Sequence, residues 1–297
     1  MSEKMRLERI RSFTHGNAVY SVAFSADGKQ LATASLDNTV RLWNLMTGEQ
    51  TGTLRGHGDG VAFVGYLADG RIVTASLDRT LKCWPAEGGA ALATFSGHQD
   101  YLSCAAAGST GTLLASGGFD KTIRLWDAQT SQSVAVLQGH TGNLQSVAIS
   151  GDGKRVASGG DDLSIRLWDV ETKSLIQTLA GHSRSVEGLA FSPDGSQLAS
   201  VSGDGTVRIW SRDGLPVRTM ETGGGLKSVA FSRRGTRLAT GGTDGALRIW
   251  DPAVGTPLTS AAAHKNTVYG VAFSPDDKLV ASAGFDRTIH LWSVLAD

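Results

Sequence analysis

A short pattern that ends in tryptophan recurs seven times along the 297-residue chain. Each copy places an aspartate six residues before the tryptophan, as in "SGGDDLSIRLWD" and "SAGFDRTIHLW". All seven tryptophans of the protein take part, at intervals of 40 to 42 residues: Trp43, Trp84, Trp126, Trp168, Trp210, Trp250 and Trp292. Self-similarity at such a period indicates one supersecondary unit that is repeated and buries its faces against its neighbours.

Apolar and polar residues alternate with a period of two inside each unit, which is typical of strands. The first unit predicts four short strands, at residues 19–25, 30–35, 39–43 and 50–54. Tight turns such as "ADGK" and "LDN" join them, with Asp and Gly where turns favour them. No window of ten residues has a convincing helical pattern, so the sequence predicts an all-β fold.

The repeated motifs carry a family resemblance. A Gly-His pair, a strand ending in "LAFSPDG", then "LAS", an aspartate turn and "LWD" resemble the WD-repeat β-propeller family, and the match runs from Leu7 to Val294. The resemblance implies a seven-bladed propeller with four antiparallel strands per blade around a central channel.

The two ends of the chain predict how the ring closes. The start, "RIRSFTHG", is similar to the fourth strand and histidine loop of a unit, whereas the chain ends just after a third strand. The N-terminal strand would therefore complete the last blade, which leaves no frayed blade. We expect a short tail at 1–6 and a single propeller domain at 7–295.

Four polar side chains recur in fixed order in the units. Six units have a histidine, a hydroxyl, the turn aspartate and the tryptophan: His15, Thr33, Asp37 and Trp43; His57, Thr74, Asp78 and Trp84; His98, Ser116, Asp120 and Trp126; His140, Ser158, Asp162 and Trp168; His182, Ser200, Asp204 and Trp210; His264, Ser282, Asp286 and Trp292. The resemblance implies that each set forms a buried hydrogen-bond network.

A serine, a histidine and an aspartate together also suggest a catalytic triad. An enzyme would hardly repeat six copies of its active site around a ring, so we interpret these residues as structural.

Unit six departs from the pattern. It has Thr240, Asp244 and Trp250, but Thr222 and three glycines stand where the histidine is expected. We expect a looser loop there, with faster amide exchange than in the other units.

Another repeated position lies two residues before each tryptophan. It is basic in six units (Arg41, Lys82, Arg124, Arg166, Arg208 and Arg248) and is His290 in the seventh. A basic stripe of this kind would suit nucleic acid, but its regular spacing favours a structural or solvated role.

Composition narrows the possible partners. Lysine plus arginine and aspartate plus glutamate both total 28, so no net charge attracts nucleic acid or an anionic membrane. Cys83 and Cys104 lack metal-type spacing, and neither a signal peptide nor a run of 18 apolar residues is present. We expect a soluble, cytoplasmic protein without a cofactor or a metal.

A partner site is expected where the units differ. The resemblance implies that two positions per blade face the top of the ring: the residue before the turn aspartate and the fifth residue after the histidine. On one side these positions, with Tyr101 beside them, are mostly apolar: Tyr20, Leu36, Ala62, Leu77, Tyr101, Ser103, Phe119, Tyr269 and Phe285. On the other side they are polar: Gln145, Asp161, Glu187, Gly203, Lys227 and Thr243.

Exposed apolar arcs mark partner sites and aromatic residues dominate interface energy, so we expect this face to bind a peptide or protein segment. A basic group of the partner would reach Asp161 and Glu187. Alternatively, the aromatic residues pack on one another across the channel mouth.

The main alternative function is a propeller hydrolase or lyase that uses Asp161 and Glu187 as channel carboxylates. Two carboxylates do not make an active site without a nearby base, a set of metal ligands or a phosphate-binding loop. We therefore expect a non-catalytic interaction scaffold. It would be a monomeric ring, alone or inside a larger complex.

Overall fold

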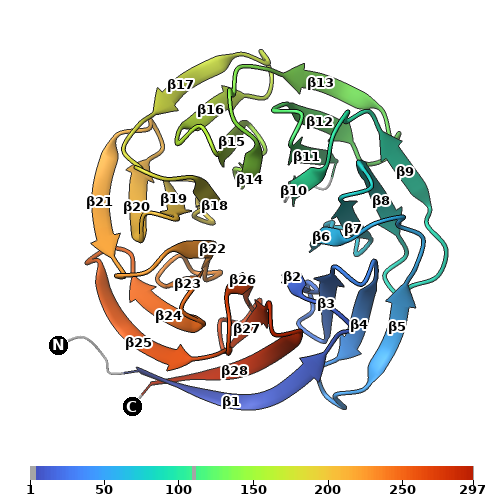
Figure 1. The fold of residues 1–297 in the computed structure, drawn as a ribbon, viewed down its shortest axis with the longest axis vertical. Coiled ribbons are helices and arrows are strands. Elements are labelled where there is room, and N and C mark those ends of the chain that lie inside the picture. The colour runs from blue at the N-terminus through green and yellow to red at the C-terminus, as the bar shows by residue number, and fades with distance from the viewer. Residues whose placement is uncertain (1–4, 109–111, 297) are drawn as a thin grey trace.

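The computed structural model describes residues 5–108 and 112–296, and all the regular secondary structure of these residues is β-strand. The strands form seven four-stranded antiparallel sheets arranged as blades around a channel (Figure 1). The seven-bladed propeller predicted from the repeats is therefore confirmed.

The first four blades follow the chain in order. Blade one is β2 (Val19–Phe24), β3 (Gln30–Ser35), β4 (Val40–Asn44) and β5 (Gln50–Leu54). Blade two is β6 (Val61–Tyr66), β7 (Ile72–Ser76), β8 (Thr80–Trp84) and β9 (Ala93–Ser96). Blade three is β10 (Leu102–Ala107), β11 (Leu113–Gly118), β12 (Ile123–Asp127) and β13 (Ser133–Leu137). Blade four is β14 (Leu144–Ile149), β15 (Arg155–Gly160), β16 (Ile165–Asp169) and β17 (Leu175–Leu179).

The last three blades include the closure of the ring. Blade five is β18 (Val186–Phe191), β19 (Gln197–Ser202), β20 (Thr206–Ser211) and β21 (Pro216–Glu221). Blade six is β22 (Leu226–Phe231), β23 (Leu238–Gly242), β24 (Ala246–Asp251) and β25 (Thr256–Ala262). Blade seven is β26 (Val268–Phe273), β27 (Leu279–Gly284), β28 (Thr288–Ala296) and β1 (Met5–Thr14).

Strand β1 pairs antiparallel with β28, so the N-terminal strand completes the last blade as predicted (Figure 1). The sequence predicts a domain start at residue 7, whereas β1 begins at Met5. Met5 belongs to the strand because it pairs with Ala296 and is buried against blade-six residues such as Leu247. Residues 1–4 of the predicted tail lie outside the described residues.

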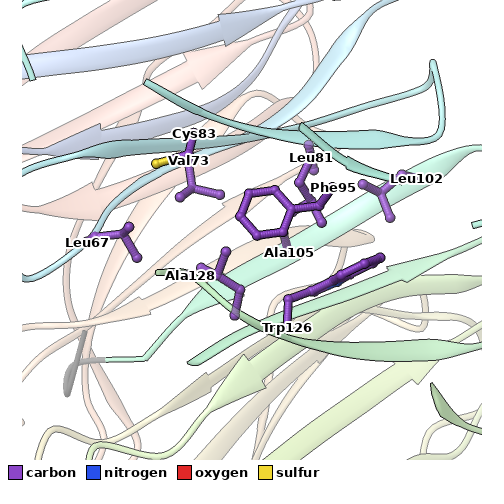
Figure 2. Close-up of a cluster of buried hydrophobic side chains, with 11 residues drawn as sticks. Leu67, Val73, Leu81, Cys83, Phe95, Leu102, Ala105, Trp126 and Ala128 are labelled. Atoms are coloured by element: carbon purple, nitrogen blue, oxygen red, sulfur yellow. The ribbon is translucent and has the colours of Figure 1, made fainter. Parts of the chain in front are cut away.

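The hydrophobic core lies between the blades rather than within one central cluster. Figure 2 shows the interface of blades two and three, where the Phe95 ring meets Trp126 edge-on at 5.9 Å and Leu81, Cys83 and Leu102 surround the pair. Equivalent clusters lie between the other neighbouring blades and pack them together. Each blade is apolar on both faces, so it is stable only with a neighbour on each side.

The inner strands of the blades surround the channel: β2, β6, β10, β14, β18, β22 and β26 (Figure 1). Their starts, together with the turns between the second and third strands, form one mouth of the channel, which we call the top mouth. This arrangement gathers residues from seven distant parts of the sequence around one opening.

Candidate functional site

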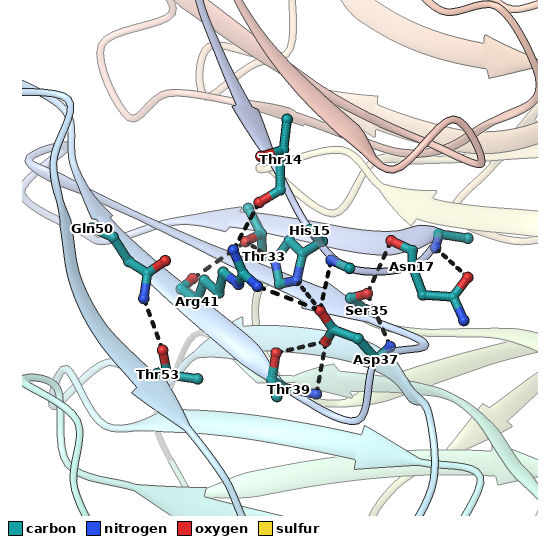
Figure 3. A network of polar contacts seen from close by, with 12 residues as sticks. Thr14, His15, Asn17, Thr33, Ser35, Asp37, Thr39, Arg41, Gln50 and Thr53 are labelled. Atoms are coloured by element: carbon teal, nitrogen blue, oxygen red, sulfur yellow. Dashed lines mark hydrogen bonds and ion pairs between the residues drawn. The ribbon is translucent and has the colours of Figure 1, made fainter.

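The polar network of blade one illustrates the contacts at the top of the six blades that have the histidine (Figure 3). Because the carboxylate of Asp37 accepts a hydrogen bond from His15 Nδ1 at 3.0 Å, His15 Nε2 accepts from the hydroxyl of Thr33 at 2.8 Å. The same hydroxyl accepts from Trp43 Nε1 at 2.9 Å. Asp37 also accepts from the backbone N–H of Gly16 and the hydroxyl of Thr39.

The same bonds recur in the other units that have the histidine. Histidine Nδ1 lies 2.7–3.0 Å from the aspartate, and Nε2 lies 2.7–2.8 Å from the hydroxyl. All seven hydroxyl residues are 0% exposed: Thr33, Thr74, Ser116, Ser158, Ser200, Thr240 and Ser282. A nucleophile sealed from solvent cannot reach a substrate, so the geometry argues for a structural role.

Electrostatics favour a neutral His140 and an ionised Asp37 in their networks. Burial lowers the pKa of His140 below its usual value, and the hydrogen bond to Asp162 offsets only part of that effect. Burial of Asp37 opposes its ionisation, but the hydrogen bonds from Thr39, His15 and Gly16 outweigh it and lower the pKa to about 2.

Unit six makes different contacts. The hydroxyl of Thr240 accepts from Trp250 Nε1 at 2.9 Å, and Asp244 pairs with Arg248 instead of a histidine. The Thr222 hydroxyl lies 2.9 Å from the carbonyl of Gly205 and 2.8 Å from that of Gly224. The loop is therefore tied to itself and to the turn of blade five, without a link to its own buried hydroxyl.

The basic position before each tryptophan takes several local partners. Arg41 donates to the carbonyl of Thr14, Lys82 donates to Thr94, and Arg124 lies over the ring of Trp126. In blade seven the His290 ring instead stacks on His264, with centroids 4.6 Å apart.

The residues that vary between units gather at the top mouth, in a cavity of about 510 Å³. Eleven of the residues predicted to face the top of the ring line it: Tyr20, Leu36, Ala62, Leu77, Tyr101, Ser103, Phe119, Gln145, Glu187, Lys227 and Tyr269. Asp161 lies beside it, because its carboxylate accepts from the side chain of Gln145 at 3.1 Å. Phe285 contacts the Tyr269 ring with centroids 6.2 Å apart.

The aromatic side chains of the mouth pack on one another and also remain accessible. Tyr20 and Tyr269 stack with centroids 4.2 Å apart, and Tyr101 meets Phe119 edge-on at 5.9 Å. Burial and the neighbouring Tyr269 raise the pKa of Tyr20, so the Tyr20 phenol stays neutral. Tyr101 is nevertheless 46% exposed and Phe285 50% exposed. Mutual packing fixes the rings in place and leaves apolar edges facing solvent.

The polar side of the mouth differs from the acidic pair that the sequence suggests. Glu187 forms an ion pair with Lys227 at 2.7 Å, because the same position in consecutive blades lies on adjacent inner strands. Asp161 instead accepts from the hydroxyl of Ser185 at 2.8 Å. Sequence reasoning placed Glu187 and Lys227 on the same face but missed their pairing, which their matching positions in neighbouring units would have revealed.

A second opening, of about 1290 Å³, lies at the opposite ends of the inner strands. Phe24, Phe191, Phe231 and Phe273 line it at equivalent positions of four blades. Its phenylalanines occupy one equivalent position in four blades, whereas each variable position of the top mouth is aromatic in only two units, with Tyr20 and Tyr269 at one position and Phe119 and Phe285 at the other. Within residues 5–108 and 112–296, no helix has the length and hydropathy needed to span a membrane.

Comparison with known proteins gives short matches to individual proteins. The chain is 46% identical over 43 residues to the Denticleless protein homolog of Danio rerio and 64% identical over 33 residues to the Notchless protein homolog of Arabidopsis thaliana. These matches cover 14% and 11% of this chain, and only 7% of each relative.

The family comparison covers most of the chain. The model of the WD domain, G-beta repeat, matches seven segments: 7–44, 48–85, 89–127, 131–169, 173–211, 214–251 and 255–293. Each segment ends at or just after one of the seven repeated tryptophans. The chain belongs to the WD40 repeat family.

Proposed function

We propose that this propeller is a non-catalytic scaffold that binds a peptide or protein segment at the top mouth. WD40 propellers generally mediate protein interactions, which supports the class of function. The observation that carries the proposal is that eleven residues varying between the units line one cavity, with partly exposed aromatic rings at its rim. Exposed aromatic rings held in fixed positions are typical of interface anchors.

The proposed partner segment places apolar side chains against the Tyr20–Tyr269 stack and the Tyr101–Phe119 pair. Both pairs are already ordered by their own ring contacts, so binding costs little side-chain entropy. A basic group of the partner would lie at Asp161, which is exposed, rather than at Glu187, which Lys227 neutralises.

The enzyme alternative has less support in this geometry. Its two carboxylates already have other partners. Glu187 forms an ion pair with Lys227, and Asp161 accepts hydrogen bonds from Ser185 and Gln145. A general acid and base pair would need both groups directed at one reacting centre. We therefore propose a scaffold rather than a hydrolase or lyase.

The wider setting of the protein is also a proposal. Equal numbers of basic and acidic residues support a protein partner over nucleic acid or an anionic membrane. Both cysteines are free and buried, which suits a reducing cytoplasm. We propose a cytoplasmic, monomeric ring that works alone or in a larger complex.

The test is affinity capture from native lysate with three proteins. One is the wild type, and the second is Tyr20→Ala, Phe119→Ala, Phe285→Ala. The third, a matched control, removes exposed apolar side chains far from the top mouth: Met46→Ala, Leu215→Ala, Val254→Ala. Circular dichroism and urea unfolding establish that all three are folded.

We expect particular proteins to be retained by the wild type and the control but lost by the top-mouth variant. Identical capture by all three proteins would contradict the proposal and direct attention to the opposite opening or the blade edges. The single substitution Asp161→Lys then tests the contact with a basic group of the partner. We expect it to weaken binding, and a partner whose affinity is unchanged does not use that carboxylate.

A further inference from the structure

Blade seven brings together three side chains of metal-binding type. His264 lies in the loop before β26, Asp286 in the turn between β27 and β28, and His290 on β28. One donor atom from each lies within 4.8 Å of the other two. All three come from the blade that closes the ring.

This cluster arises from a single departure from the repeat. The other six units have arginine or lysine at the position of His290, where a fixed positive charge would repel a cation. Unit seven has an imidazole instead, which supplies a neutral nitrogen ligand. The remaining histidine and aspartate pairs, such as His15 with Asp37, therefore lack this third ligand and serve as internal references.

The protein holds the outward-facing atom of each of the three residues. The Ser12 hydroxyl on β1 lies 2.8 Å from His290 Nδ1, and the Ser282 hydroxyl lies 2.8 Å from His264 Nε2. The backbone N–H of Lys265 donates to Asp286 Oδ2 at 3.0 Å. Protein groups that fix the far side of imidazole and carboxylate ligands are characteristic of metal sites.

The inward-facing atoms converge on one hydroxyl. Thr288 Oγ1 lies 3.0 Å from His264 Nδ1, 3.2 Å from His290 Nε2 and 2.6 Å from Asp286 Oδ1. The Thr288 hydroxyl thus lies within 3.2 Å of two imidazole nitrogens and a carboxylate oxygen. Nitrogen and oxygen donors of this kind suit zinc and its neighbours nickel and copper, rather than magnesium or calcium.

We propose that His264, Asp286 and His290 form a binding site for a divalent transition-metal ion such as Zn²⁺, with the Thr288 hydroxyl at the fourth position. Donors on a tetrahedral zinc ion lie about 3.3 Å apart, given zinc–ligand bonds of about 2.0–2.1 Å. His264 Nδ1 and Asp286 Oδ1 are 2.9 Å apart, so they separate slightly. His290 stacks on His264 with the ring planes 27° apart, so its ring must also turn to direct Nε2 at the ion.

Metal binding requires a change of histidine tautomer. His264 Nδ1 donates to Asp286 in the metal-free protein, so that proton is lost from Nδ1 when the nitrogen binds the ion. The ring then carries its proton on Nε2 and donates to the Ser282 hydroxyl, which can accept this bond as well as the one from Trp292. The bound ion would join a loop, a turn and a strand of the closing blade.

The first test is a titration of tag-free, chelator-treated wild-type protein with Co²⁺, a visible probe of zinc sites. We expect tetrahedral Co²⁺ absorption bands that saturate at one equivalent and that Zn²⁺ abolishes. We also expect Zn²⁺ to raise the Tm by a few degrees, because an ion that binds only the folded state stabilises it. Absence of both effects in the wild type would overturn the proposal without recourse to any variant.

The second test uses His290→Arg and His290→Lys, which restore the residues of the other units and keep all six histidine–aspartate pairs. Circular dichroism identifies the variant that is folded, and unit two shows that lysine is compatible with a blade. Loss of the Co²⁺ bands and of the Zn²⁺-dependent rise in Tm supports the site. Unchanged binding in the folded variant would place the ion elsewhere and overturn the assignment.

Discussion

At the residue scale, the buried hydroxyl is the centre of each network. In unit two the Thr74 hydroxyl bonds both His57 Nε2 and Trp84 Nε1, whereas in unit six the Thr240 hydroxyl bonds Trp250 Nε1. Replacing each threonine by valine keeps the shape of the side chain and removes only the hydroxyl. The two substitutions therefore compare a network with a histidine and one without it.

We predict that Thr74→Val lowers the free energy of unfolding by about 2–4 kcal/mol, because it leaves two buried polar groups without a partner. Thr240→Val leaves one such group and should cost about 1–2 kcal/mol. Urea unfolding of both variants measures the difference. Equal losses would show that the histidine bond contributes little.

At the element scale, the turn after each aspartate requires a left-handed backbone. Gly205 and Gly245 adopt it with φ of 82° and 76°, but Leu163 adopts it with φ of 66°. Leu163 and Leu175 are similarly exposed, and Leu175 lies on the ordinary strand β17. We predict that Leu163→Gly raises the free energy of unfolding by roughly 0.5–1 kcal/mol, whereas Leu175→Gly lowers it. A loss of stability in both proteins would show that the turn is not strained.

The loop of unit six is a second prediction at this scale. Thr222 and the three glycines after it lack the link from histidine to a buried hydroxyl, although Thr222 bonds neighbouring carbonyls. We expect hydrogen exchange at residues 222–225 to be faster than in the histidine loops of the other blades. Protection equal to that of those loops would mean that the carbonyl bonds replace the histidine fully.

At the scale of the whole molecule, closure of the ring depends on β1. Phe13 on this strand is 4% exposed and its ring lies 4.6 Å from that of Trp43 in blade one, whereas Ile10 at the strand's irregularity is 50% exposed. We predict that Phe13→Ala costs about 3–5 kcal/mol. Ile10→Ala should change stability by less than about 0.5 kcal/mol. Similar small effects at both positions would indicate that β1 is dispensable.

Acid sensitivity is also a property of the whole ring, because equivalent networks occur in several blades. Burial lowers the pKa of His15, His140 and His182 from 6.5, so these groups take up more protons in the unfolded state. Their contribution to stability is present above pH 6.5 and is lost as the pH falls below that value. The Asp37 and Asp204 carboxylates, with pKa values of about 2, add a second loss below their usual 3.8. Urea midpoints should fall in both ranges, and a rise on acidification would contradict this prediction.

The sequence predicted most of the fold because the repeat specifies it seven times. The strands of blade one lie within a residue of their predicted bounds, and the closure by β1 follows from the incomplete last unit. The site was less predictable, since contacts such as Tyr20 with Tyr269 and Glu187 with Lys227 cross between blades. A repeat pattern aligns equivalent positions, but side-chain pairing depends on which residues occupy them in neighbouring blades.

The most direct test of the central claim is a hydrogen-exchange footprint of a captured partner on the wild-type propeller. We predict added protection at the top ends of β2, β10 and β26, which carry Tyr20 and Tyr269 and adjoin Tyr101. The outer strands and the opposite opening should be unchanged. Protection confined to those regions, with none at the top mouth, would contradict the proposal that the residues varying between units form the binding site.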